Sequence, residues 1–128
     1  MGSWFYIHLV RKFANQLIML KNFILVGLGG SIGSMLRYAA SFLPNKNFPV
    51  STLLINIAGS FIIGLIAGIY LKNDLLSNNY KLFFATGVCG GFTTFSTFAN
   101  ENLALLRDGN IFNFAIYAGL SVFIGILA

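Results

Sequence analysis

The stretch VCGGFTTFSTFANE, residues 88–101, places polar groups inside a long run of sequence that is almost free of charge. It contains two adjacent glycines, four hydroxyl side chains and three phenylalanines, and it ends in one of only three acidic residues in the chain. Gly90 and Gly91 favour an interruption of the helix before Phe95. Interrupted backbone at membrane depth is tolerated only where it is buried or lines a cavity, so the stretch predicts a pore or an ion site.

The composition of the whole chain is typical of a membrane protein. Of its 128 residues, 57% are hydrophobic and 9% are charged, whereas a soluble domain carries about a quarter charged residues. The uncharged segments approach the roughly 20 apolar residues that a membrane-spanning helix requires. The sequence therefore predicts an all-α membrane protein of four transmembrane helices, the third of them broken, with no room for a soluble domain. The expected helices lie near residues 20–43, 49–71, 81–106 and 111–128.

Small residues recur at the spacing that allows membrane helices to approach closely. Gly29 and Gly33 form a GxxxG pair in the first predicted helix, and the second helix repeats the pattern at Ser60, Gly64 and Gly68. The glycines of the first helix lack the preceding strand and the later acidic residue of a dinucleotide-binding motif. We therefore expect them to serve helix packing, within one chain and between subunits.

Several function classes are excluded by the pattern of charge and cysteine. The net charge of +5 does not indicate nucleic acid, because the basic residues lie at the ends of the predicted helices, where Lys and Arg normally flank membrane spans. Cys89 is the single cysteine, and no metal-ligand spacing is present, so no disulfide within the chain is expected. No catalytic triad or acid–base pair is present, and no enzyme activity is predicted.

Residues 1–18 are expected to form a separate amino-terminal extension before a channel-like domain at residues 19–128. The extension either lies in the membrane interface as an amphipathic segment or precedes an alternative start of translation at Met19. Its charges follow its apolar residues, which is the reverse of the order in a secretory signal.

Three polar residues at membrane depth each allow two interpretations. Asn56 is either hydrogen-bonding glue between helices or a pore residue, since a carboxamide at this depth must find partners in protein or in water. Arg37 either snorkels to the interface or attracts anions into a vestibule. Glu101 is either an ordinary charge near a helix end or a group that faces a pore.

The aromatic face beside these residues indicates an ion site but leaves the sign of the ion open. Phe95 and Phe98 are three positions apart and share one side of a helix, with Thr94 and Thr97 on the neighbouring side. Carbonyl and hydroxyl oxygens suit a cation, whereas hydroxyl donors, Asn56 and the positive edges of the rings suit an anion.

Three motifs resemble those of a known family, the Fluc (CrcB-type) fluoride channels of microbes. They are GGSIGSMLRY, LLINIAGSFIIG and GVCGGFTTFSTFANE, and the resemblance covers residues 19–128. It implies a channel that exports fluoride across the plasma membrane and relieves fluoride toxicity. It also implies a dual-topology, antiparallel homodimer with two pores and a structural sodium ion at its centre.

The resemblance also assigns roles to single residues around the two phenylalanines. Asn56 matches the pore asparagine that donates hydrogen bonds to fluoride. Phe95 and Phe98 match the two phenylalanines whose ring edges face the anion, and Ser96 and Thr97 match the adjoining hydroxyls.

Further residues are matched along the rest of the expected pathway. Glu101 matches the acidic residue at one end of the pore, and Tyr117 and Ser121 match a polar track on the fourth helix. Many relatives carry another hydroxyl one turn later, where this chain has Gly125. Arg37 matches the arginine near the vestibule.

The sodium ion is assigned to backbone rather than to side chains. Gly90 and Thr93 match the break whose carbonyl oxygens, paired with those of the second subunit, hold sodium in the family. No side-chain metal ligand is expected.

Two other functions compete with the fluoride channel. One is a small dual-topology exporter of lipophilic cations, which resembles small multidrug transporters. It requires a carboxylate deep in the membrane, and the first predicted helix has none. The other is a non-transporting subunit of a membrane assembly, which leaves the cluster of Phe, Thr and Ser side chains without a role.

Overall fold

The computed structural model describes residues 2–43, 48–72 and 77–128. Every regular element in these ranges is helical, which confirms the predicted all-α class. The elements are α1 (Gly2–Ala40), α2 (Val50–Lys72), α3 (Asn78–Tyr80), the π-type helix η1 (Lys81–Cys89), α4 (Gly90–Phe92), α5 (Phe95–Arg107) and α6 (Ile111–Leu127). The polar turn predicted at residues 44–47 and most of the loop after α2 lie outside the described residues.

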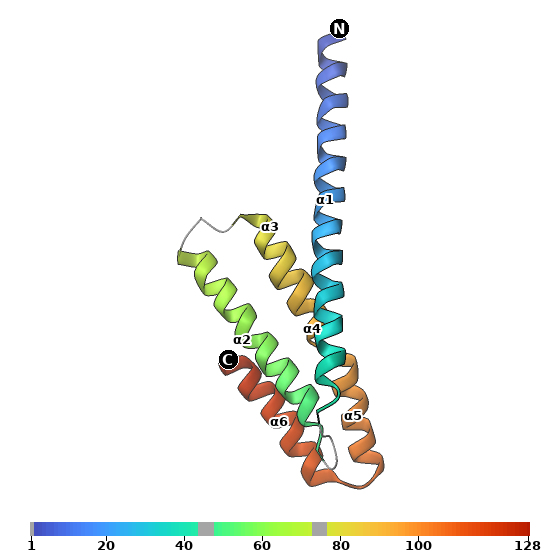
Figure 1. Ribbon diagram of the computed structural model, residues 1–128, viewed down its shortest axis with the longest axis vertical. Helices are drawn as coiled ribbons and strands as arrows, with labels where there is room; N and C mark the ends of the chain where they lie inside the picture. Colours follow the sequence, from blue (N-terminus) through green and yellow to red (C-terminus); the bar gives the residue numbers. More distant parts are fainter. Residues whose placement is uncertain (1, 44–47, 73–76) are drawn as a thin grey trace.

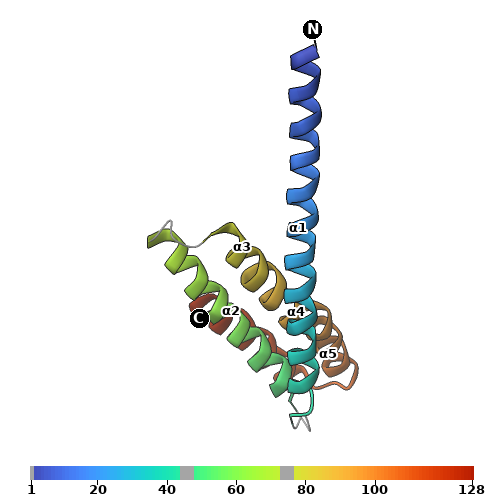
Figure 2. The ribbon, with the colours of Figure 1, turned by 45° about the horizontal axis from the view of Figure 1, so that its top comes forward.

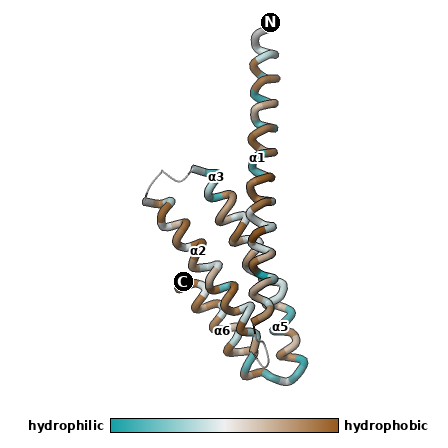
Figure 3. Tube along the Cα trace, in the orientation of Figure 1, coloured by the Kyte–Doolittle hydropathy of each residue, from teal (hydrophilic) through white to brown (hydrophobic). Residues whose placement is uncertain are grey.

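Three helical segments are long and apolar enough to cross a membrane, namely Tyr6–Ala40, Val50–Leu71 and Asn78–Arg107. The fourth predicted span is the shorter apolar helix α6, with 17 residues. At 1.5 Å per residue it is about 26 Å long, close to the roughly 30 Å of a hydrocarbon core. Figure 3 shows that apolar residues dominate α2, α6 and much of α1, as expected for helices that face lipid, whereas α5 is more polar.

The first helix begins much earlier than predicted. α1 starts at Gly2 instead of near residue 20, and it continues through the predicted extension without a break. Residues 3–26 contain neither Gly nor Pro, so nothing in them ends a helix. In Figures 1 and 2 the amino-terminal half of α1 projects well beyond the other helices. The carboxyl end comes sooner than predicted, because Ser41, Phe42 and Leu43 form turns.

Close backbone contacts hold α1 against the third span. A Cβ atom added at Gly29 would overlap the carbonyl oxygen of Phe83, and one at Gly33 would overlap that of Val88. From the other side, a Cβ at Gly91 would overlap the carbonyl oxygen of Gly30. The predicted packing role of the first pair of glycines is therefore confirmed.

The second small-residue pattern packs in part. A Cβ atom at Gly64 would lie 3.5 Å from the carbonyl oxygen of Ala128, so this glycine faces the end of α6. Within the described residues a Cβ at Gly68 would meet nothing within 4 Å. Gly68 thus has no packing role inside this part of the chain.

Gly33→Ala is expected to destabilise the fold by about 1–3 kcal/mol, the usual range for added volume in a packed core. The carbonyl of Val88 belongs to the backbone of η1 and cannot rotate away as a side chain would. Gly27→Ala is the matched control, because a Cβ atom there meets nothing within 4 Å in the described structure. Thermal unfolding in detergent measures the difference, and equal unfolding temperatures for both variants would contradict the close approach.

The third span changes direction at two threonines. Thr93 and Thr94 have extended backbone (φ −73°, ψ 156° and φ −150°, ψ 117°) between α4 and α5. The extended residues lie directly before Phe95, as predicted, whereas Gly90 and Gly91 themselves lie within α4. Thr94 begins the next helix as its N-cap, because its Oγ1 accepts a hydrogen bond from the amide of Thr97 at 3.2 Å.

Candidate functional site

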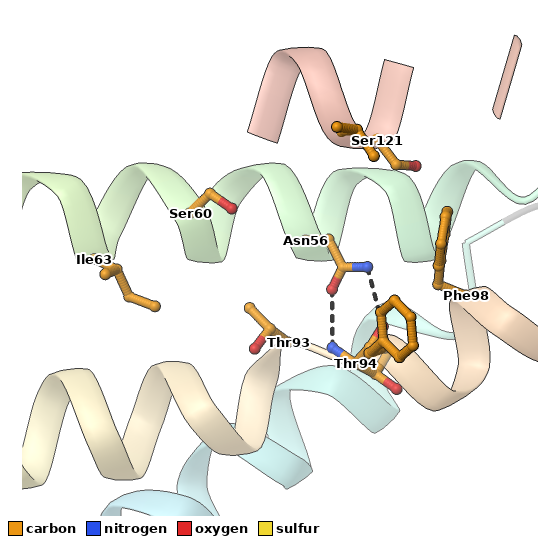
Figure 4. A pocket seen from close by; sticks show the side chains of 9 residues that line it. Asn56, Ser60, Ile63, Thr93, Thr94, Phe98 and Ser121 are labelled. Atoms are coloured by element: carbon orange, nitrogen blue, oxygen red, sulfur yellow. Dashed lines mark hydrogen bonds between the residues drawn. The ribbon is translucent and has the colours of Figure 1, made fainter. Parts of the chain in front are cut away.

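Asn56 of α2 fastens the extended segment to the helix beside it. Its Oδ1 accepts a hydrogen bond from the amide of Thr94 at 2.8 Å, and its Nδ2 donates one to the carbonyl of Thr94 at 3.1 Å (Figure 4). A carboxamide has two N–H donors, so these two bonds leave one donor of Asn56 for another group. Asn56 is therefore glue between helices, and it also retains the donor that a pore residue requires.

A cavity of about 310 Å³ lies beside this pair of hydrogen bonds, and several of the predicted site residues line it. Its lining comes from α2, the extended segment, α5 and α6, as Figure 4 shows, and comprises Asn56, Ser60, Ile63, Thr93, Thr94, Phe95, Phe98, Ser121 and Val122. The Oγ atom of Ser121 is buried and has no hydrogen-bond partner among the described residues. A buried hydroxyl normally has a partner, so Ser121 is the residue of this lining whose hydrogen-bonding capacity the described residues leave unsatisfied.

The two phenylalanines share one wall of the cavity, as predicted from their spacing. Their ring centroids are 5.7 Å apart and tilted by 42°. Phe98 is half-buried, and its ring lies 5.1 Å from that of Tyr117. Phe95 is 79% exposed in the single chain. An aromatic ring this exposed beside a polar cavity is a surface that lipid or another subunit must cover.

Glu101 joins three helices through hydroxyl groups. Thr52 of α2 donates from Oγ1 to Glu101 Oε1 at 2.8 Å, and Tyr117 of α6 donates from its phenol to Oε2 at 2.7 Å. Thr52 and Tyr117 are buried, and Glu101 is half-buried in the middle of α5. The interpretation of Glu101 as an ordinary helix-end charge is thus wrong, because both of its oxygens accept hydrogen bonds inside the protein.

Thr52 was not predicted as a site residue. It could have been found from its position one turn before Asn56, which places both side chains on the same side of α2. Thr94 was also missed as a site residue, although it lines the cavity, caps α5 and binds Asn56.

The predicted hydroxyls next to the phenylalanines do not lie with Asn56. Thr97 lines a second cavity, of about 260 Å³, together with Arg37. The remaining walls of that cavity are Ser34, Tyr38, Ser41, Ser51, Thr52, Ile55 and Thr94. Ser96 is exposed, lies 3.3 Å from the hydroxyl of Thr94, and lines neither of these two cavities.

Arg37 occupies the last turn of α1 and is half-buried. It contributes a positive charge to a cavity whose other polar groups are mostly hydroxyls. Thr52 and Thr94 line this cavity and also bind Glu101 and Asn56, so the second cavity adjoins both parts of the site. This environment fits a vestibule cation better than a side chain that only snorkels.

Beside Gly125, where the polar track predicted on the fourth helix lacks a hydroxyl, α2 supplies one. A Cβ atom at Gly125 would lie 3.6 Å from the Oγ of Ser60. Ser60 therefore places a hydroxyl from α2 beside the position where many relatives were expected to carry one on α6. Sequence analysis assigned Ser60 to packing alone, and only the pairing of α2 with α6 shows its second position.

The carbonyl groups at the interruption lose their helical partners. In a continuous helix the carbonyl of Gly90 would accept from the amide of Thr94, but that amide donates to Asn56. Thr93 is extended, and its hydroxyl donates to the carbonyl of Cys89 at 2.9 Å. Among the described residues no group of three His, Cys, Asp or Glu side chains is suited to a metal ion. Any cation at this point would bind to carbonyl oxygens, as occurs at unwound membrane helices.

Comparison with known proteins places the chain in a family. The model of the family described as "CrcB-like protein, Camphor Resistance (CrcB)" matches residues 24–128. A protein of Azobacteroides pseudotrichonymphae named "Fluoride-specific ion channel FluC" is 44% identical over 114 residues, which cover 86% of this chain and 91% of the relative.

Two further relatives carry the same name. The one from Flavobacterium psychrophilum is 43% identical over 113 residues, covering 85% of this chain and 91% of the relative. One from Campylobacter jejuni is 47% identical over 114 residues, covering 86% of this chain and 93% of the relative. The predicted resemblance is thus confirmed: this chain belongs to the CrcB-like family, as a multi-pass protein of the plasma membrane.

Proposed function

We propose that the chain is a fluoride-selective channel that lets fluoride leave the cell and so relieves fluoride toxicity. The relatives named above support this assignment. The observation that carries it is the cavity in which a donor of Asn56, the unpartnered hydroxyl of Ser121 and the rings of Phe95 and Phe98 meet. Each of these groups can turn positive potential toward an anion, through an N–H, an O–H or a ring edge, and none carries a negative charge.

Fluoride is small and strongly hydrated, so a pore must replace its water with close donors. Asn56 and Ser121 supply such donors, whereas ring edges add a weaker positive potential. Weak sites next to stronger ones let an ion enter and also leave, which conduction requires. The carboxylate of Glu101 keeps its negative charge, which Thr52 and Tyr117 offset in part by donating to both of its oxygens.

The pathway begins at the cavity lined by Arg37. A guanidinium group in a low-dielectric wall raises the local concentration of anions. From there Thr94 leads to the Asn56 cavity, since it lines both spaces. Glu101, Tyr117 and Ser121 continue the polar surface between α5 and α6. Ser96 and Thr97 act at the approach to this route.

Fluoride efflux from proteoliposomes tests the proposal, with chloride and a lipophilic cation measured in parallel. A channel for fluoride releases fluoride rapidly and the other two ions slowly. Proton-coupled movement of the cation would instead support a small multidrug exporter. The absence of any flux, with the protein correctly assembled, would support a non-transporting assembly subunit.

The functional unit is an antiparallel homodimer of chains with four spans each and a broken third span. Two features of the single chain support this arrangement. Phe95 is exposed beside the cavity and requires a covering surface. One chain contributes two carbonyl oxygens from Gly90 and Thr93, which is too few to enclose a cation. A second, inverted copy would double that number around a common centre.

A sodium ion would fit this oxygen-only site, held by the carbonyls of Gly90 and Thr93 from both subunits. It would neutralise the partial negative charge of two helix carboxyl ends and so hold the interruptions together. We expect prolonged dialysis into sodium-free buffer to lower fluoride efflux, and readdition of sodium to restore it. Potassium at equal concentration is the control. Flux that is indifferent to sodium removal would eliminate the site.

The distribution of basic residues bears on dual topology. Five of the eight Lys and Arg residues lie on the side of the amino terminus, namely Arg11, Lys12, Lys21, Lys72 and Lys81. The other side has Arg37, Lys46 and Arg107, of which Lys46 lies outside the described residues. A chain that starts at Met19 loses Arg11 and Lys12, and the two sides then become equal. Because positive charge in short loops sets orientation, a balanced count leaves insertion undecided.

We expect the chain that starts at Met19 to insert in both orientations in similar amounts. The full chain should favour an amino terminus that faces the cytoplasm. Reporter fusions at each terminus measure the two populations, and Arg11→Gln with Lys12→Gln in the full chain is the matched control for charge. A single orientation of the Met19 form would refute an antiparallel homodimer of that form.

A further inference from the structure

Residues 2–20 form the amino-terminal part of α1, which lies before the region matched by the family model. This part continues α1 beyond the end of the helical bundle (Figures 1 and 2). At 1.5 Å per residue, residues 2–20 are about 28 Å long. The function proposed above uses none of them.

Two stripes run along this part of α1. A polar stripe contains His8, Arg11, Lys12, Asn15 and Gln16. An apolar stripe contains Tyr6, Leu9, Val10, Phe13 and Leu17, and all five of its side chains are exposed. Spacings of three, four and seven residues define one side of a helix, so the two stripes lie on opposite sides between residues 6 and 17. At the ends of the segment, Trp4 and Met19 are apolar and exposed on the polar side.

The bilayer boundary lies where the extension leaves the bundle. A cavity lined by Leu25, Asn79, Tyr80, Phe83 and Phe84 places the start of the third span beside Leu25. The amino group of Lys81 lies 5.0 Å above the ring of Tyr70, and Lys21 stands one turn before Leu25. Tyrosine and lysine at helix ends are typical of the membrane interface. The stripes therefore begin at the surface of the membrane and not inside it.

The register of the stripes fixes the direction in which the extension must bend. Positions 18 apart lie on nearly the same side of a helix, because about 3.6 residues make one turn. The polar residues Arg11 and Asn15 thus lie on the same side of α1 as Gly29 and Gly33, which pack against η1 and α4.

The apolar stripe lies on the opposite, outward side of α1. Tyr6 shares this side with Ile24, and Val10 shares it with Leu28, and both Ile24 and Leu28 are exposed. If α1 bends outward at the membrane surface, its outward side turns toward the bilayer. That bend places the apolar stripe in the acyl boundary and leaves the polar stripe among the headgroups.

We propose that residues 4–20 are a membrane-surface helix that binds anionic lipid headgroups around the channel. The charge pattern selects this occupant over neutral lipid. Arg11 and Lys12 are the charged residues of the segment, Lys21 follows it directly, and no acidic residue precedes Asp74. Amphipathic helices with a basic polar side bind anionic surfaces, with the apolar side buried about 5–10 Å below the headgroups. The inference does not depend on which ion the channel conducts.

Tryptophan fluorescence of the full chain in vesicles tests the proposal, because Trp4 is the only tryptophan. Two variants move this probe: Trp4→Phe with Phe13→Trp places it on the apolar stripe, and Trp4→Phe with Asn15→Trp places it on the polar stripe. In vesicles that contain phosphatidylglycerol, acyl-brominated lipid should quench the probe at position 13 at least about twofold more than the probe at position 15.

The role of charge is tested by Arg11→Gln with Lys12→Gln in the position-13 probe variant. Loss of both charges should lower the ratio of bound to free helix by about 30-fold, from about 1 kcal/mol for each charge. Arg107→Gln, at the other end of the bundle, is the control and should change nothing. Replacing phosphatidylglycerol by phosphatidylcholine should act like the double charge variant.

Two results would overturn the proposal. Equal quenching at positions 13 and 15 would mean that no side of the extension faces the bilayer. A probe at position 13 that is shielded from water, yet not quenched by brominated lipid, would mean that a second copy of the chain covers the stripe. Dilution to one channel per vesicle would then expose the probe again.

Discussion

Asn56→Asp is expected to lower fluoride efflux by roughly 1,000-fold while the protein still folds. The substitution places a negative charge in the cavity that fluoride must enter. Two like charges about 4 Å apart repel by about 4 kcal/mol at an effective dielectric constant of about 20, and each 1.4 kcal/mol is a factor of ten in occupancy. The hydrogen bond that Oδ1 accepts from the amide of Thr94 remains possible, so one of the two hydrogen bonds between this side chain and Thr94 is kept.

Asn56→Leu separates the effect of the added charge from the effect of losing the hydrogen bonds to Thr94. Leucine removes both hydrogen bonds to Thr94 but adds no charge. If repulsion dominates, the aspartate variant conducts less fluoride than the leucine variant. If Asn56 acts only as glue, the order is reversed, because aspartate keeps one bond and leucine keeps none. Efflux from proteoliposomes, with chromatography to check assembly, decides between the two.

Phe98→Ile is expected to lower fluoride efflux by about two- to tenfold. Isoleucine keeps the apolar volume but lacks the positive ring edge, whose contacts are worth roughly 0.5–1.5 kcal/mol. Phe98 lies between Phe95 and Tyr117, so its loss also removes two aromatic contacts that orient the wall of the cavity. Phe95→Ile should act in the same direction, since the two rings share that wall.

Phe123→Ile is the matched control for the aromatic substitutions. Phe123 lies on α6, is 70% exposed, and does not line the cavity. Its replacement should leave efflux unchanged and should test the general tolerance of the fold to loss of a ring. Wild-type efflux in the Phe98 and Phe95 variants would show that the two rings serve packing alone.

Much of the architecture followed from local pattern. Runs without charge predicted the helical segments, because lipid excludes unpaired charge over the length of a span. The spacing of Gly29 and Gly33 predicted a close helix contact, and their backbone contacts with η1 confirm it. The spacing of Phe95 and Phe98 predicted a shared side, and both rings line one cavity. Each of these features depends on residues within a single segment of the chain.

Other features were decided only by tertiary structure. The adjacent glycines indicated an interruption before Phe95, but they did not indicate that Thr93 and Thr94 are the residues with extended backbone. The extended backbone there is held by Asn56, which is 38 positions away from Thr94 in the chain. Gly91 is required instead for contact with the backbone of Gly30. Local propensity cannot reveal that a hydrogen-bond partner on another helix makes extended backbone favourable.

The surroundings of Glu101 illustrate the same limit. Its sequence position was compatible with a surface charge, and nothing local distinguished it from one. Thr52, 49 positions away, and Tyr117, 16 positions away, surround its carboxylate with donors. A carboxylate inside a membrane protein requires such partners, because burial without them costs several kcal/mol. The sequence by itself determined which groups lie at membrane depth, and the packing of α2, α5 and α6 determined which of them meet.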